Sequence, residues 1–390
     1  MAYTKKIAYI PELILLFLYI SLYPLGKLLS TTLFSQQLNV IDTLSILSIP
    51  IFIIKKDKLP SLYLRFTSFL MVAAFSFMLS LLYFSFKETL AGLFYLIRLF
   101  SYFTLSAAAY RVFKYNKNSK EIFFKLFYIS LLIFSLIGWY QYFVFSDLTT
   151  LKYAGWDDHL GRLVSTLLDP AFAGIILVFA TLTSMIIFFK KNKYAYLLLA
   201  VYFFVTMMFT YSRASYIAFL GGALYLIFRF IKFKKLIFTL ILLFLLLPFL
   251  PRPKSEGVRL ERTFSIFAKA KNYQETFLIL KKYPLFGVGF NNICSVRERY
   301  FFDDASSHAC HGADSSLLFI LATTGIIGFL IFFNFAISAV KETSDNIYGI
   351  LIKSSGVALL IHSFFANSMF YNFVMGYFAI ILPLGLRSKK

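Results

Sequence analysis

The feature that most constrains this chain is a succession of long apolar runs separated by short polar breaks. A helix that crosses a bilayer needs about 20 apolar residues, and most of the runs approach that length. They lack the period-two alternation of a membrane β-barrel strand, so run length predicts helices. We expect spans near residues 8–29, 37–54, 61–86, 90–110, 122–146, 166–189, 194–211, 214–230, 236–250, 314–340, 347–366 and 369–386.

The composition excludes a soluble globular domain of this length. Of 390 residues, 59% are hydrophobic and 15% are charged. A soluble domain carries about 25% charged residues, because its surface needs a polar shell. A helix in a bilayer satisfies its own backbone hydrogen bonds and needs no such shell. The sequence therefore predicts an all-α polytopic membrane protein of about 12 transmembrane helices.

The net charge of +21 is a topology signal. Lysines and arginines gather in short clusters between the apolar runs, and no basic helix or aromatic-basic motif indicates nucleic-acid binding. With twelve spans, all seven clusters fall on one side, which we expect to be cytoplasmic together with both termini. The clusters are Lys5-Lys6, Lys55-Lys56-Lys58, Arg111 to Lys120, Lys190-Lys191-Lys193, Arg229 to Lys235, Lys341 and Arg387 to Lys390.

Two hydrophilic segments then face outward. Residues 1–250 are expected to hold the first nine spans with the short outer loop 147–165, and residues 314–390 the last three. Between them lies a long outer loop, 251–313, and a loop of this size in a compact protein is usually functional. Cys294 and Cys310 both fall in it and could form a disulfide outside the cytosol, which the sequence leaves open.

Arginines within or at the ends of spans are the first candidates for function, because burying a guanidinium is costly. Arg213 interrupts two apolar runs at the outward surface, where its planar fork of donors suits a phosphate or pyrophosphate. The alternative is a hairpin arginine that reaches lipid headgroups. Arg98 fits a structural ion pair or a functional role. Arg259 and Arg262 would share a helix face, which could also be a solvated basic face. The intramembrane candidates are Arg65, Arg98, Arg162 and Arg213.

A polar segment, 303–314, precedes the tenth expected span and contains two of the four histidines. A histidine or carboxylate there could act as a general base toward an attacking hydroxyl. The alternatives are a zinc site, although neither CxxC nor HExxH is present, or a merely polar loop. No Walker A sequence and no GxGxxG after a strand appear, so an ATP-driven pump is not expected.

The order of these pieces resembles the O-antigen ligase and polymerase superfamily, which also includes some protein O-oligosaccharyltransferases. The likeness runs over most of the chain and is densest from Arg162 to Phe329. Each motif is degenerate alone, and their order carries the resemblance. The motifs are Gly161 to Thr166 with Asp169-Pro170, Tyr211 to Ser215, Pro284 to Asn291, and the helix opening Leu317 to Gly328.

The resemblance implies a glycan donor carried on a polyprenyl pyrophosphate, in the bacterial inner membrane. The glycan passes to a hydroxyl of another glycan or of a lipid anchor, with neither metal nor other cofactor. Arg213 matches the helix-end arginine and Arg259 or Arg262 the loop arginine, which the family assigns to the pyrophosphate, and Arg162 is expected to assist substrate binding. The sequence does not distinguish a ligase acceptor from a polymerase acceptor.

The base has two candidates. The family's histidine lies about eleven residues before the helix glycine, and counting back eleven from Gly325 gives Asp314. His311 lies three residues earlier, about one helical turn. We expect His311 to be the base or to position the acceptor, with Asp314 as its partner, or the reverse.

A transporter or flippase of lipid-linked oligosaccharide is the rival hypothesis, since it also needs buried arginines and many helices. Such proteins usually show two similar halves or matching broken helices. No such symmetry is seen in the sequence, so an enzyme is favoured.

Overall fold

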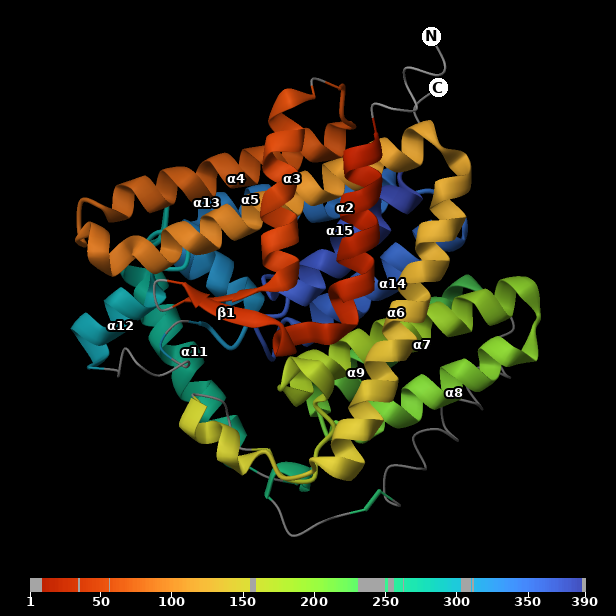
Figure 1. Ribbon diagram of the computed structural model, residues 1–390. Helices are drawn as coiled ribbons and strands as arrows, with labels where there is room; N and C mark the ends of the chain where they lie inside the picture. The colour runs from red at the N-terminus through yellow and green to blue at the C-terminus, as the bar shows by residue number, and fades with distance from the viewer. Residues whose placement is uncertain are drawn as a thin grey trace.

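The computed structural model describes residues 9–33, 36–55, 57–154, 159–230, 250–251, 256–261, 263–302, 310 and 312–387. Over these residues the chain is a bundle of helices with one small β-hairpin (Figure 1). The strands are β1 (Ser30–Leu33) and β2 (Gln36–Asn39), paired antiparallel. The α-helices are α2 (Ile10–Leu22), α3 (Val40–Ile54), α4 (Ser61–Ser80), α5 (Phe86–Tyr115), α6 (Lys117–Val144), α7 (Pro170–Lys191), α8 (Tyr194–Met208), α9 (Arg213–Arg229), α11 (Phe264–Lys282), α12 (Ile293–Phe301), α13 (Ser316–Glu342), α14 (Ile347–His362) and α15 (Asn372–Gly385), and the 3₁₀ helices are η1 (Tyr23–Leu28), η2 (Thr149–Ala154), η3 (Ser165–Leu167) and η5 (Glu256–Val258).

Each expected span that the structure describes contains an α-helix, whereas the expected span 236–250 lies outside the described residues except for Leu250. Among the described residues, six helices are long and apolar enough to cross a membrane by length and composition: α2 together with η1, α4, α5, α6, α7 and α13. The apolar helices α3, α8, α14 and α15 are shorter. The helical, membrane-protein class is therefore as predicted, and the count of twelve spans stays a prediction.

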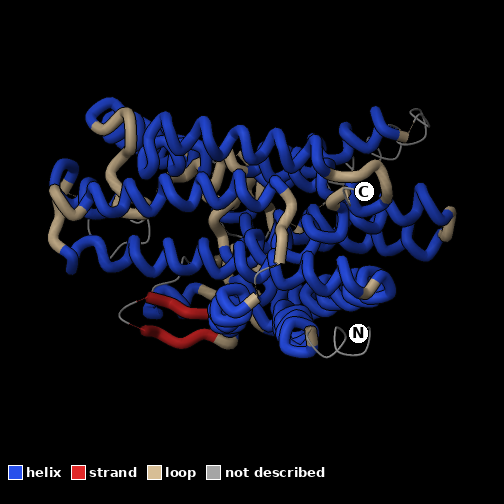
Figure 2. Tube along the Cα trace, turned by 90° about the horizontal axis from the view of Figure 1, so that it is seen from above, coloured by secondary structure: helices blue, strands red, loops and turns tan. Residues whose placement is uncertain are grey.

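The hairpin changes one expected boundary. The apolar run from residue 37 was expected to be helical throughout, but α3 begins at Val40. Asn39 precedes it, and the Asn39 backbone N–H donates to the Asp42 carboxylate at 3.2 Å, half of a capping box. The residues before this cap pair with β1, with Ser30 opposite Asn39. Figure 2 shows the hairpin at the edge of the helical body.

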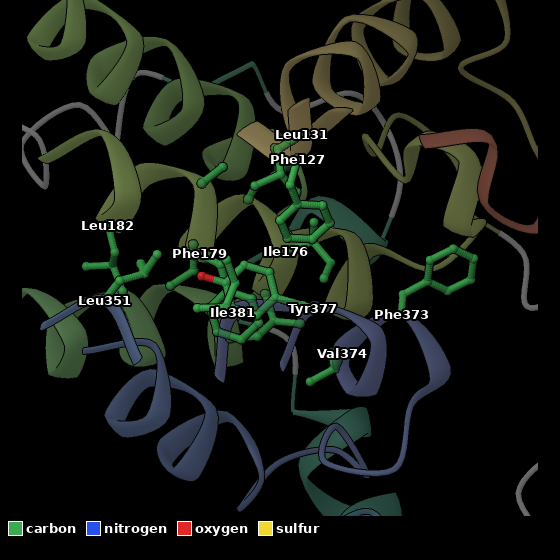
Figure 3. Packing of buried hydrophobic residues seen from close by; sticks show 14 of the residues in the cluster. Phe127, Leu131, Ile176, Phe179, Leu182, Leu351, Phe373, Val374, Tyr377 and Ile381 are labelled. Atoms are coloured by element: carbon green, nitrogen blue, oxygen red, sulfur yellow. The ribbon is translucent and has the colours of Figure 1, made fainter. Parts of the chain in front are cut away.

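The core has two parts. One is built on α2, α3, α6, α7, α8, α9, α14 and α15, the other on α4, α11, α12 and α13, and α5 contributes to both. Helix α7 is the most enclosed, with 83% of its apolar stretch buried against 39% for α4, so it faces protein rather than lipid. Figure 3 shows Phe179 of α7 against Tyr377 of α15, and the two rings stack with centroids 4.4 Å apart. Aromatic pairs in this geometry stabilise by about 0.5–1.5 kcal/mol beyond their buried area.

Three of the predicted basic clusters make contacts at helix ends. Lys55 at the end of α3 contacts Glu12 of α2 at 2.5 Å, and Arg111 of α5 contacts Asp57 at 3.4 Å. Arg111 also donates to the Lys55 carbonyl at 2.8 Å, so two of the predicted basic clusters touch. Arg387 donates to the Thr343 carbonyl at 3.1 Å, which brings the last cluster beside the end of α13. The placement of all the clusters on one membrane face stays a prediction.

Candidate functional site

Arg213 is the first residue of α9. Ser212 caps the helix by accepting from the Ser215 backbone N–H at 3.3 Å. From this position Arg213 Nη1 donates to the carbonyl of Leu260 at 3.1 Å. The contact holds the segment 256–261, with the exposed Arg259, against the start of α9. A helix N-terminus carries partial positive charge and unpaired N–H groups, so an arginine beside it favours an anion.

Arg162 lies behind the same turn and is 8% exposed. Its Nε donates to the Thr210 carbonyl at 3.0 Å and its Nη2 to the Tyr211 carbonyl at 3.5 Å. The next residue, Leu163, donates its backbone N–H to the Phe209 carbonyl at 2.9 Å. The end of the short outer loop is therefore fastened to the turn between α8 and α9, and Arg162 organises the backbone that presents Arg213.

Asp314 lies two residues before the start of α13. Its backbone N–H donates to Asn272 Oδ1 at 2.8 Å, and its carboxylate pairs with Lys269 Nζ at 3.7 Å. The carboxylate side chain is 42% exposed, so it is held by α11 and still open to a ligand. The other candidate base, His311, and the loop arginine Arg262 lie outside the described residues.

Tyr273 of α11 completes the contact with Asp314. Its hydroxyl donates to the Asp314 carbonyl at 3.3 Å and also to the Phe364 carbonyl. Burial, followed by the negative charge of Asp314, raises the pKa of Tyr273 to about 12. The phenol therefore stays protonated across the neutral range and acts as a donor, not as a base.

The end of α14, His362, and the connection to α15 that follows it, residues 363–371, join the start of α9 to the start of α13. His362 accepts or donates at Nε2 to Ser215 Oγ on α9, 3.3 Å away, and its Nδ1 lies 2.5 Å from Ser368 Oγ. The Ser316 backbone N–H at the start of α13 donates to the Ser363 carbonyl at 2.9 Å. The helix starts next to Arg213 and Asp314 are thus docked on one segment. Sequence reasoning passed over His362 inside an apolar run, although a fully buried imidazole in a span was the available signal.

Two motifs that are separate in the sequence form one structural unit. The chain at Pro284 to Val288 lies in a break of α13, where Gly325 has φ +66°. The Ile326 N–H donates to the Pro284 carbonyl at 2.8 Å, and the Val288 N–H to the Ala322 carbonyl at 2.9 Å. The break leaves N–H and carbonyl groups of α13 without partners in the helix, and the backbone of 284–288 provides those partners. It therefore fixes the half of α13 that begins beside Asp314.

A cavity of about 420 Å³ runs between α4, α5, α13, α14 and α15. Its walls are almost entirely apolar, with Phe66, Phe332 and Leu360 among them. At one end it shares residues with a small chamber of about 30 Å³. Both cavities include the side chains of Leu99, Phe370 and Met375.

The chamber differs from the cavity in having several polar side chains on its wall. It is lined by Arg98, Asn291 and Asn367, among others. Arg98 forms a buried ion pair with Asp42 at 3.1 Å, so one of the two interpretations of Arg98, the structural pair, is present. Asn291 Nδ2 and Asn367 Oδ1 have no hydrogen-bond partner within the described part of the chain. Buried amide groups of this kind bind water or a hydroxyl-bearing ligand.

Cys294 and Cys310 form a disulfide, with Cα atoms 4.7 Å apart. The pairing that the sequence left open is therefore made. It ties the first turn of α12 to the residue just before His311.

Part of the chain matches a known family. A comparison with curated proteins gives no significant match. The family model described as O-Antigen ligase matches residues 198–333, about a third of the chain, from α8 into α13. That stretch contains Arg213, Arg259, Arg262, His311 and Asp314, whereas Arg162 lies before it. The expected resemblance to the O-antigen ligase superfamily is therefore confirmed over residues 198–333.

Proposed function

We propose that this protein is a membrane glycosyltransferase that moves a glycan from a polyprenyl-pyrophosphate donor to an acceptor hydroxyl. It is of the O-antigen ligase or polymerase type. The observation that carries the proposal is the family match over 198–333, which contains the start of α9 and the start of α13. These two helix starts dock on the same connection, through His362 and through Ser363.

The pyrophosphate is assigned to Arg213, with Arg259 and Arg262 from the loop. As the glycosidic bond breaks, the bonding electrons pass to the pyrophosphate oxygen, and the leaving group gains negative charge. Fixed cations and helix N–H groups stabilise that charge without reorganising. The contact of Arg213 with the Leu260 carbonyl supports this assignment, because it brings the segment with Arg259 to the α9 N-terminus.

The lipid part of the donor is assigned to the apolar cavity. Its volume of about 420 Å³ falls in the range of about 300–1,000 Å³ that ligand pockets usually occupy. A hydrocarbon chain matches its walls, since burial of apolar surface needs no polar partner. The adjoining chamber, about 30 Å³, has room for a water or a single hydroxyl beside the Asn291 and Asn367 amide groups.

The base is assigned to the segment before α13. His311 or Asp314 takes the proton of the acceptor hydroxyl as the anomeric carbon is attacked. The Lys269 ammonium keeps the Asp314 carboxylate oriented. The proposal places the loop 251–313 and the short loop 147–165 on the outer face, with residues 1–250 and 314–390 forming the membrane part and both termini cytoplasmic. The Cys294–Cys310 disulfide supports that placement, since disulfides persist outside the cytosol.

The direct test is a transfer assay. The purified protein is incubated with a lipid-linked oligosaccharide and two acceptors, a lipid anchor and a second lipid-linked glycan. We expect a glycosylated acceptor together with released polyprenyl pyrophosphate, and the acceptor used separates ligase from polymerase.

The same preparation in sealed vesicles tests the rival hypothesis of a flippase. A flippase moves a fluorescent lipid-linked oligosaccharide between leaflets and leaves the glycosidic bond intact. Translocation without bond cleavage would overturn the proposed function.

A further inference from the structure

Helix α12 carries a buried arginine that the family motifs do not include. Its first turn, from Ile293 to Arg297, is buried throughout, and the Arg297 side chain is 1% exposed. Figure 1 shows α12 beside α11 at one side of the molecule, away from α7 and α8. Removing a guanidinium from water costs several kcal/mol, which only well-placed partners offset. The partners that offset this cost therefore indicate what the buried Arg297 guanidinium does.

The partners of Arg297 come from two places. Its Nη1 donates to the Gly312 carbonyl at 2.7 Å. Its Nη2 lies 3.1 Å from Thr276 Oγ1 and 3.3 Å from the Asn272 carbonyl, and its Nε is 3.6 Å from the Glu275 carboxylate. The guanidinium thus joins α11 to a carbonyl between the two candidate bases.

Asn272 holds the same segment from the other side. Its Oδ1 accepts from the Asp314 N–H at 2.8 Å, and its Nδ2 donates to the Gly312 carbonyl at 3.4 Å. Cys310 is fixed covalently by Cys294, three residues before Arg297 in α12. The backbone is therefore held at residues 310, 312 and 314 by groups on α11 and α12.

We propose that Arg297, with Asn272 and the Cys294–Cys310 disulfide, is a positioning device for the segment 310–314 that presents the base. The inference rests on the proposed function for the meaning of that segment. Among the described residues, Arg297 contacts this segment through the Gly312 carbonyl, and we assign it the role of a positioning residue. A displacement of about 1 Å in a catalytic group lowers the rate by about 10²-fold.

The test compares Arg297→Ala and Arg297→Lys with Arg299→Ala. Arg299 lies two residues further along α12. Its side chain is 46% exposed, and its guanidinium contacts the Glu88 carboxylate instead. We expect Arg297→Ala to lower kcat by about 10²-fold with the donor KM unchanged. Guanidinium ion added to Arg297→Ala should restore part of kcat, and Arg299→Ala should behave as wild type.

Arg297→Lys and the Cys294→Ser/Cys310→Ser variant keep the test decisive if Arg297→Ala does not insert. Each removes one anchor, so each should lower kcat and leave KM. Equal kcat per folded molecule in Arg297→Lys, in the double cysteine variant and in wild type would overturn the proposal.

Hydrogen exchange of the backbone gives a readout that does not need turnover. Arg297→Lys should speed exchange at 312–314 and leave α14 unchanged. If exchange at 312–314 is faster in Arg297→Lys than in wild type but wild type transfers no glycan, the proposed function fails and the positioning device stands. If exchange at 312–314 is unchanged while wild type is active, the positioning device is wrong.

Discussion

Gly325 and Leu285 are in direct backbone contact across the break in α13, and a Cβ on Gly325 would collide with the Leu285 carbonyl. Gly325 has φ +66° and ψ −170°, a conformation open essentially to glycine alone. The loop that starts at Pro284 can dock only because this position lacks a side chain. The contact couples helix α13 to the segment that begins at Pro284.

Gly325→Ala should destabilise the protein. Placing alanine in this backbone region costs about 1–3 kcal/mol before the collision with Leu285 is added. Gly356 of α14 is the matched control, since no heavy atom lies within 4 Å of its added Cβ. Thermal unfolding in detergent should show a lower Tm for Gly325→Ala and an unchanged or higher one for Gly356→Ala. Equal transitions would mean that the break tolerates a side chain.

Arg213→Lys should lose activity without loss of folding. An ammonium cannot reproduce the paired donors of the guanidinium, and one lost contact at the transition state costs about 10²–10³ in rate. The assay is glycan transfer per inserted molecule, with the exposed Arg229 at the other end of α9 changed to lysine as the control. Wild-type turnover in Arg213→Lys would leave Arg213 a structural hairpin arginine.

Arg162→Ala should behave differently from Arg213→Lys. Arg162 is buried and donates to the Thr210 and Tyr211 carbonyls, so the alanine variant leaves these two carbonyls without a charged donor. Each such loss costs about 1–3 kcal/mol. Both Tm and activity should therefore fall, whereas Arg213→Lys should lower activity alone. A stable but inactive Arg162→Ala protein would instead point to a direct contact between Arg162 and substrate.

Single alanine substitutions of His311 and Asp314, assayed across pH, separate the two candidate bases. An unperturbed histidine titrates near neutrality, so His311→Ala should abolish transfer or remove the limb of the profile near pH 6.5. Tyr273, with a pKa of about 12, contributes no limb in that range. If His311→Ala keeps both rate and profile while Asp314→Ala is inactive, Asp314 is the base. Full activity in both variants would show that the family mechanism does not apply.

Reporter fusions at Lys191 and Lys271 test the topology. Lys191 ends α7 within a basic cluster, and Lys271 is an exposed residue of α11. We expect a cytoplasmic signal at Lys191 and an outer signal at Lys271, because basic loops are retained inside. The same signal at both positions would reject twelve spans with an outward loop 251–313.

The sequence by itself determined the membrane class, the helical spans and the candidate residues. Run length and composition are local properties, and a bilayer imposes them strongly, so α4, α7 and α13 could be predicted within a few residues. The polar break at Arg213 was also readable because arginine in a span is unusual, and the motif around Gly325 was readable through the family resemblance.

Only the tertiary structure decided how these pieces meet. Nothing local in the sequence couples Pro284 to Gly325, His362 to Ser215, or Arg297 to Gly312, since these contacts join residues far apart along the chain or on different elements. Buried polar groups choose partners by three-dimensional reach and by the cost of leaving a donor unpaired. The same cost fixes the Arg162 guanidinium on the backbone of the turn that presents Arg213.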